Sequence, residues 1–310
     1  MKKLQILPLA AGAALLASLT AAVQVHAQDV IYVDNPKFVT PLVERWIDEY
    51  AKSNPHVQIK RAESSEKADL RFAAITSSSS EASSSEAITY AARYALLPVT
   101  TKANPLIGTL SKSKLDKKKL RKLFFAEKDL ASGEDNNKLN IATPVTVYSG
   151  NHPASAAPVY AAYFGYSISN LRGKRVSGDD IFLLNAIKKD AAGVTFNTLN
   201  YLYDTETRQL KEGLAILPLD VKKEQREALY SNNIDQAIAL LEEEKIDVIP
   251  APHIGAVYSR EAAVAVHDFA RWIVTEGQQY NHGYGFLNPD KKLLALQQQQ
   301  AQKQILTSEK

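Results

Sequence analysis

The sequence predicts an α/β protein built as a two-lobed clamp, with a hinge made of two chain crossings. Short apolar runs alternate with helical patterns along the chain, which is typical of an α/β fold. A length of 310 residues suits two domains of ordinary size. The order of strands and helices starts again after a Pro-containing stretch near residue 100, so a second lobe is expected there. Lobes joined in this way capture a ligand by hinge closure.

The first lobe is expected to open with a strand at residues 30–33, a turn at residues 34–36 and a helix that ends near Lys52. Six apolar side chains recur at helical spacing in this helix: Phe38, Leu42, Val43, Trp46, Ile47 and Tyr50. Two further strands are expected, at residues 57–60 and 68–75. The serine-rich residues 76–86 are expected to form a solvated loop.

The second lobe follows an apolar run at residues 94–99. Its expected elements are a basic helix within residues 110–125, strands at 145–148, 194–196 and 213–217, and helices at 154–166, from 179 onward and at 231–245. The expected crossings are Pro98 with the stretch at residues 100–105, and the Pro-containing stretch at residues 246–250. A helix at residues 260–280 and a polar, Gln-rich tail from Asp290 then complete the chain. This organisation assigns residues 28–99 and 250–310 to lobe one and residues 100–249 to lobe two.

Residues 1–27 have the features of a cleavable secretory signal. Lys2 and Lys3 precede an apolar stretch at residues 4–23, and Val25-His26-Ala27 has the small-x-small form of a cleavage site. The alternative is a single membrane anchor, because the apolar stretch is nearly long enough to span a bilayer. Pro8, Gly12 and the many alanines weaken that alternative. We therefore expect an exported protein.

Composition and motifs exclude several classes of function. The formal charge of +3 is too small for the basic footprint of a nucleic-acid-binding protein. Cysteine is absent, which excludes disulfides, thiolate zinc sites and cysteine nucleophiles. The sequence contains no Gly-x-Ser-x-Gly, no His-x-x-x-His and no glycine-rich nucleotide loop. The Glu242-Glu243-Glu244 run is expected to be a solvated helix face. We expect no catalytic activity, no metal and no cofactor.

Two strand-to-helix turns are candidates for a ligand site. Helix N-termini bind oxyanions because their amides and dipole favour negative charge. Residues 34–38 form the first turn and residues 149–155 the second, so Lys37, Ser149 and Ser155 would face each other across a cleft with the Asn151 amide. The alternative is that both turns only cap their helices, since Asn, Ser and Pro are common at such positions without any ligand.

Several segments resemble the PstS family, the periplasmic phosphate-binding receptors of ABC transporters. Residues 31–46 read IYVDNPKFVTPLVERW, in which Phe38, Pro41 and Trp46 fit the opening strand and helix of that family. Residues 110–125 are similar to its leucine-rich helix that leads to an "IF" motif, and residues 147–160 correspond to its Arg-x-Asp-Gly-Ser-Gly-Thr phosphate loop. Similarity continues through residues 179–196 and 272–287. The resemblance therefore covers most of the chain that follows the signal.

The candidate site departs from the family pattern. Ser149 stands where the family has arginine, and Asn151 stands where it has aspartate. Ser155 keeps a hydroxyl at the position of the family's threonine. In lobe one, Lys37 replaces a threonine, and Ala74 stands where the family has the aspartate that accepts the phosphate proton.

The resemblance implies a type II periplasmic binding protein that captures a small oxyanion, phosphate or a relative of it. The implied partner is an ABC transporter permease in the inner membrane. The predicted ligand-binding residues are Lys37, Phe38, Ser149, Asn151 and Ser155. The alternative function is a ligand-free, PstS-derived interaction module of the cell envelope, which the altered phosphate loop favours.

Overall fold

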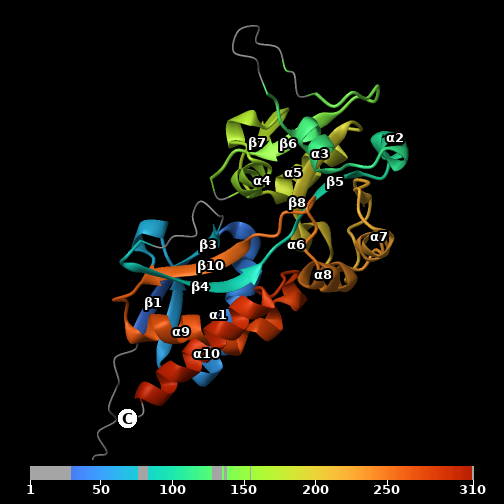
Figure 1. The fold of residues 1–310 in the computed structure, drawn as a ribbon. Helices are drawn as coiled ribbons and strands as arrows, with labels where there is room; N and C mark the ends of the chain where they lie inside the picture. Colours follow the sequence, from blue (N-terminus) through green and yellow to red (C-terminus); the bar gives the residue numbers. More distant parts are fainter. Residues whose placement is uncertain (1–28, 76–82, 128–134, 136–137, 154, 309–310) are drawn as a thin grey trace, which may run out of the picture.

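Two mixed five-stranded sheets, one in each lobe, organise the computed structural model (Figure 1). The structure describes residues 29–75, 83–127, 135, 138–153 and 155–308. The predicted signal at residues 1–27 and residues 76–82 of the predicted serine-rich loop lie outside the described residues. Within the described residues, no helix combines the length and the apolar character needed to cross a bilayer.

The first sheet contains strands from both ends of the chain. Its order is β2 (Val57–Arg61), β1 (Asp29–Asp34), β3 (Leu70–Ile75), β10 (His253–Ser259) and β4 (Glu86–Arg93). Strand β1 pairs in parallel with both neighbours, whereas β10 is antiparallel to β3 and β4. β10 follows the whole second lobe in the sequence. The chain therefore returns to the first lobe and places β10 between β3 and β4.

Helix α1 (Thr40–Ser53) packs on this sheet through its apolar face. Leu42, Val43, Trp46 and Tyr50 are all buried, as their helical spacing predicts. Helix α9 (Val264–Thr275) contacts β1, β4 and α1. The N-terminal and C-terminal segments therefore share one hydrophobic core.

The second sheet has the order β7 (Lys174–Val176), β6 (Thr146–Gly150), β8 (Gly193–Thr198), β5 (Leu96–Thr101) and β9 (Leu214–Ile216). In the described part of this lobe, seven α-helices accompany the sheet: α2 (Leu106–Lys112), α3 (Lys117–Phe124), α4 (Ala156–Phe164), α5 (Ile181–Lys188), α6 (Leu199–Leu202), α7 (Lys223–Leu229) and α8 (Ile234–Glu243). Tyr160 of α4 stacks on Phe196 of β8, with 3.8 Å between ring centroids. This contact fastens α4 to the sheet.

The two crossings lie side by side and are hydrogen-bonded to each other. The amide of Tyr94 donates to the carbonyl of Pro252 at 3.1 Å, and the amide of Leu96 donates to that of Pro250 at 2.9 Å. The first crossing precedes the stretch at residues 100–105, because the apolar run that starts at Leu96 pairs with β8 and β9 of the second sheet. The hinge is thus a short two-stranded connection between the lobes.

Polar contacts also join the lobes beside the hinge. Glu242 of α8 accepts hydrogen bonds from the amide of Asn288 at 2.6 Å and pairs with His282 at 2.7 Å. The hydrogen bond to Glu242 is the main cause that raises the pKa of His282. The expectation of a solvated glutamate run is therefore wrong for Glu242, since α8 packs against the late segment of lobe one.

The Gln-rich segment forms helix α10 (Lys291–Ser308), which packs on α9 and covers the edge of β4. The side chain of Gln297 pairs with the backbone of Tyr90 in the manner of a neighbouring strand. Its Oε1 accepts from the Tyr90 amide at 2.7 Å, and its Nε2 donates to the Tyr90 carbonyl at 3.2 Å. The polar tail expected from the sequence is thus a helix that covers the edge of β4. Such cover matters because an exposed sheet edge can pair with strands of other chains.

The substitution Gln297→Ala should destabilise the protein by about 1–2 kcal/mol, because it leaves two backbone groups of an edge strand without partners. Urea unfolding would measure this loss, and light scattering near the midpoint should show increased self-association. Gln300→Ala is the matched control, since Gln300 lies on the exposed face of the same helix. Equal stability of the two variants would contradict this role for Gln297.

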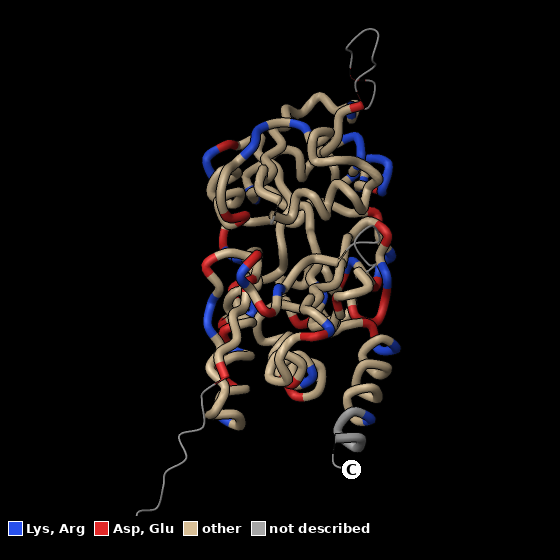
Figure 2. The backbone as a smooth tube through the Cα atoms, turned by 90° about the vertical axis from the view of Figure 1, so that its left-hand side faces the viewer, with Lys and Arg blue, Asp and Glu red and all other residues tan. Residues whose placement is uncertain are grey.

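The α/β class and the two-lobed arrangement predicted from the sequence are confirmed. Most predicted elements are present with shifted ends. Strands β4, β7 and β10 were not predicted. Basic residues (Lys and Arg) and acidic residues (Asp and Glu) both occur on each lobe (Figure 2).

Candidate functional site

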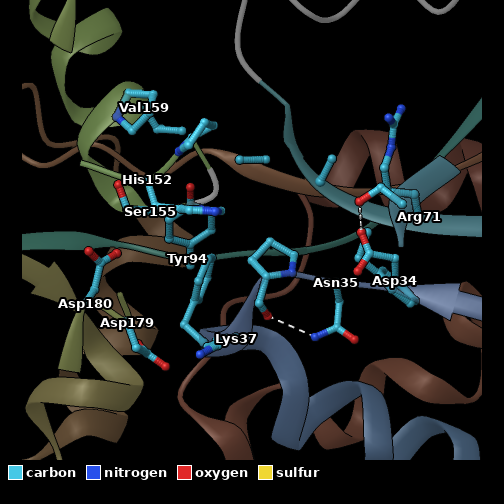
Figure 3. Close-up of a pocket in the computed structure, with 18 of the residues that line it drawn as sticks. Asp34, Asn35, Lys37, Arg71, Tyr94, His152, Ser155, Val159, Asp179 and Asp180 are labelled. Atoms are coloured by element: carbon cyan, nitrogen blue, oxygen red, sulfur yellow. Dashed lines mark hydrogen bonds between the residues drawn. The ribbon is translucent and has the colours of Figure 1, made fainter. Parts of the chain in front are cut away.

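A cavity of about 880 Å³ lies between the lobes and contains parts of both predicted turns. Figure 3 shows that its walls come from different parts of the chain, with Asn35 and Lys37 on one side and Asp179 and Asp180 on the other. Tyr94 of the first crossing also lines it. A change in the angle between the lobes would therefore change the shape of this cavity.

The first-lobe turn is shaped by Asn35. Its side-chain amide donates to the carbonyl of Pro36 at 2.9 Å and to the hydroxyl of Thr40 at 2.8 Å, which fixes the entry into α1. Lys37 follows on the exposed side of the turn, while Phe38 is buried against Tyr94 with ring centroids 4.8 Å apart. The turn thus presents a lysine to the cavity from a rigid base.

Two cations of the first-lobe wall have no carboxylate partner in the described part of the chain. Both Lys37 and Arg61 are exposed and line the cavity. By contrast, Arg71 lies 3.8 Å from Glu86, and the carboxylate of Asp34 accepts a hydrogen bond from Ser65. Lys37 and Arg61 therefore remain available to an anionic group.

The second-lobe turn is already occupied by groups of the protein itself. Ser155 is the N-cap of α4, and its hydroxyl accepts from the amide of Ala157 at 3.4 Å. The next free amide, that of Ala156, donates to Oδ2 of Asp180 at 2.6 Å. A carboxylate thus lies at the helix N-terminus, where an external oxyanion was expected to bind.

Asp180 is the most unusual charged group of the site. Only 4% of the residue is exposed, and its Oδ1 has no hydrogen-bond partner in the described part of the chain. Burial, and to a smaller extent the nearby Asp179, raise the pKa of Asp180 to about 6 against the opposite effects of the Ala156 amide and His152. A Cβ at position 150 would lie 2.8 Å from Oδ1, so glycine is required there.

Asp179 is held more completely than its neighbour. Its Oδ2 accepts from the hydroxyl of Tyr201 at 2.9 Å, and its Oδ1 accepts from the amide of Ile181 at 3.1 Å. The burial of Tyr201 and its bond to Asp179 raise the pKa of that phenol. Asp179 therefore caps the start of α5, whereas Asp180 reaches across to α4.

The structure brings together three of the five predicted ligand-binding residues. Lys37, Phe38 and Ser155 line the cavity. Ser149 is fully buried and accepts a hydrogen bond from Arg175 at 2.8 Å, and Asn151 donates to Ser177 at 2.9 Å. Neither Ser149 nor Asn151 is among the lining residues. The binding roles of all five residues stay predictions.

Sequence reasoning did not identify Tyr94, Arg61 or Asp180 as site residues. Asp180 was placed at the start of a helix, which is correct, but its partner is the N-terminus of a different helix. Tyr94 belonged to an apolar run that predicts core. The chain crosses between the lobes at Tyr94, and only the knowledge that the next residues pair with the second sheet could have indicated this.

A second cavity of about 850 Å³ lies near the hinge. Three of its charged groups pair with one another: Asp290 lies 3.1 Å from Arg93 and 3.2 Å from His253. Burial lowers the pKa of His253 despite the neighbouring Asp290. In the described part of the chain, no cluster of acidic or histidine side chains is placed to hold a metal ion.

No protein-family model and no curated protein matches the chain. Solved structures do match its fold. An ABC-type phosphate transport receptor from Vibrio cholerae aligns with 84% of this chain and 100% of its own, at a TM-score of 0.54 and 12% identity.

Two more solved structures are similar. A candidate phosphate ABC transporter substrate-binding protein from Clostridium perfringens, solved with bound phosphate, covers 84% of this chain and 100% of its own at a TM-score of 0.58 and 13% identity. A candidate phosphate-binding protein from Planctomyces limnophilus covers 90% and 99%, at a TM-score of 0.54 and 14% identity. The fold predicted from the resemblance is thereby confirmed.

Proposed function

We propose that this protein is a solute-binding receptor of the bacterial periplasm that closes its two lobes over a small oxyanion, phosphate or a relative. The observation that carries the proposal is the cavity between the lobes, whose first-lobe wall presents Lys37 and Arg61 without carboxylate partners among the residues that the structure describes. A buried oxyanion needs such charged donors, since an unpaired buried charge costs several kcal/mol. The role is binding and delivery, without catalysis.

The fold supports this proposal. Two lobes joined by a short hinge suit capture by closure, and an ABC transporter permease in the inner membrane is the proposed partner. The predicted signal at residues 1–27 would export the chain to the periplasm. Solved proteins with this fold include one described with bound phosphate.

The test is isothermal titration calorimetry of the chain from Gln28 to Lys310, after removal of carried-over ligand by partial unfolding. Phosphate is titrated first, followed by sulfate and molybdate. The substitution Lys37→Ala should weaken anion binding about tenfold, or ~1.4 kcal/mol, and reduce its dependence on salt. Lys60→Ala is the matched control, because it removes an exposed lysine of the same lobe that does not line the cavity.

One observation favours the alternative of a ligand-free interaction module. The carboxylate of Asp180 occupies the N-terminus of α4, so that helix offers its first amide to the protein and not to an anion. If all three anions fail to bind the folded protein, capture of an inorganic oxyanion is contradicted. Equal affinities of Lys37→Ala and Lys60→Ala would remove Lys37 from the site.

A further inference from the structure

The cavity is larger than a single inorganic oxyanion requires. Its volume of about 880 Å³ lies in the range of sites for organic ligands, which is about 300–1,000 Å³. Much of its lining is apolar, with Phe38, Phe72, Pro158 and Val159 among the contributors. Carbon-containing parts of a ligand would find suitable surroundings beside the charged groups.

Charges are distributed unequally across this cavity: its lysine and arginine side chains all come from the first lobe, together with the carboxylate of Asp34. The cations without a carboxylate partner, Lys37 and Arg61, belong to the first lobe. The carboxylates of Asp179 and Asp180 belong to the second lobe, and no lysine or arginine of the described part of the chain forms an ion pair with them. A ligand that spans the cavity would therefore meet positive charge at one end and negative charge at the other.

Of the two carboxylates, Asp180 has the unfilled bonding capacity. Both oxygens of Asp179 accept hydrogen bonds, but Oδ1 of Asp180 accepts none in the described part of the chain. An unsatisfied charged oxygen at 4% exposure is costly, and a cationic donor would relieve that cost more than a neutral one. Its raised pKa has the same origin, because burial disfavours the charged form.

We propose that the ligand is a small organic zwitterion in which a short chain joins an oxyanion to a protonated amine. The oxyanion contacts Lys37 and Arg61 on the first lobe, and the amine donates to Oδ1 of Asp180 on the second. Closure of the lobes brings both ends into contact at once. This inference rests on the proposed function and defines the substrate class of the same site.

The test compares three probes by titration calorimetry at pH 7.5: inorganic phosphate, ethyl phosphate and phosphoethanolamine. The last two differ mainly in the amine. Phosphoethanolamine should bind the unmodified protein at least tenfold more tightly than ethyl phosphate. In Asp180→Asn that preference should fall below threefold, while ethyl phosphate binds at least as tightly as before. Asp48→Asn, which changes an exposed carboxylate of α1 outside the cavity, should keep the full preference.

The outcomes separate the two proposals. If ethyl phosphate and phosphoethanolamine bind equally well, or if Asp180→Asn keeps the preference, the zwitterion inference is overturned and oxyanion capture stands. If none of the three probes binds a protein shown to be folded by circular dichroism, and sulfate and molybdate are also silent, both proposals fail. Preference for phosphoethanolamine that depends on Asp180 supports both.

Discussion

Replacement of Asp180 by asparagine should stabilise the folded protein at neutral pH by about 3 kcal/mol. The folded-state pKa of Asp180 is about 6, against an ordinary value of 3.8 for an aspartate, so the folded state holds this proton more tightly than the unfolded state does. Between these two pKa values the free energy of unfolding therefore falls as the pH rises, and above them the full cost of ionisation remains. Asparagine carries no such charge and retains an oxygen for the amide of Ala156.

Urea unfolding at pH 7.5 and pH 4.5 would check this prediction. The gain should be close to its full size at pH 7.5 and fall to about a third at pH 4.5, because Asp180 is then protonated in the folded state and only its ionisation in the unfolded state still lowers stability. Asp179 and His152 face the same carboxylate, so His152→Gln in the Asp180→Asn background tests whether the histidine contributes to the pH dependence. A gain that is independent of pH, or a loss of stability at pH 7.5, would show that Asp180 is not a buried charge.

The second large effect is expected at Trp46 in the core of lobe one. Trp46 is fully buried, packs on Phe72 with ring centroids 5.5 Å apart, and donates from Nε1 to the carbonyl of Gly277 at 2.9 Å. Trp46→Ala should lower the free energy of unfolding by about 4 kcal/mol, since it leaves a large cavity and an unpaired carbonyl. Trp46→Phe should cost less, because a ring remains.

Chemical denaturation followed by circular dichroism would measure both variants. Val264→Ala is the matched control, since Val264 is 74% exposed and should change stability by less than about 0.5 kcal/mol. If Trp46→Ala were as stable as this control, the bond between α1 and the late segment of the chain would not hold lobe one together.

Trp46 also explains why the family resemblance predicts the fold better than the site. Pro41 and Trp46 carry the match, and both serve the architecture: Pro41 lies in the first turn of α1, and Trp46 joins that helix to residue 277. The loop expected to bind phosphate has changed, with Ser149 turned toward Arg175 and Asn151 toward Ser177. The residues that carry the resemblance therefore predict packing and not the bonding of this loop.

The helix and strand patterns in the sequence were sufficient for most of the fold. Burial at every third or fourth residue of α1, and of nearly every residue in β5 and β8, produces patterns that are readable along the chain. The pattern was weaker for β4, in which five successive residues are only partly buried. The role of α10 could not be predicted either, because a Gln-rich segment has the same composition whether it is solvated or pairs with a strand edge.

The sequence by itself determined the α/β class, the two lobes and the first-lobe turn that presents Lys37, because these depend on contacts between residues close together in the chain. Only the tertiary structure decided which groups meet in the cavity. Asp180 and Ala156 are 24 residues apart, and Tyr94 enters the site from the hinge. A carboxylate that caps a neighbouring helix has the same local sequence as one that caps its own, so its partner is set by the packing of α4 and α5 on the same sheet.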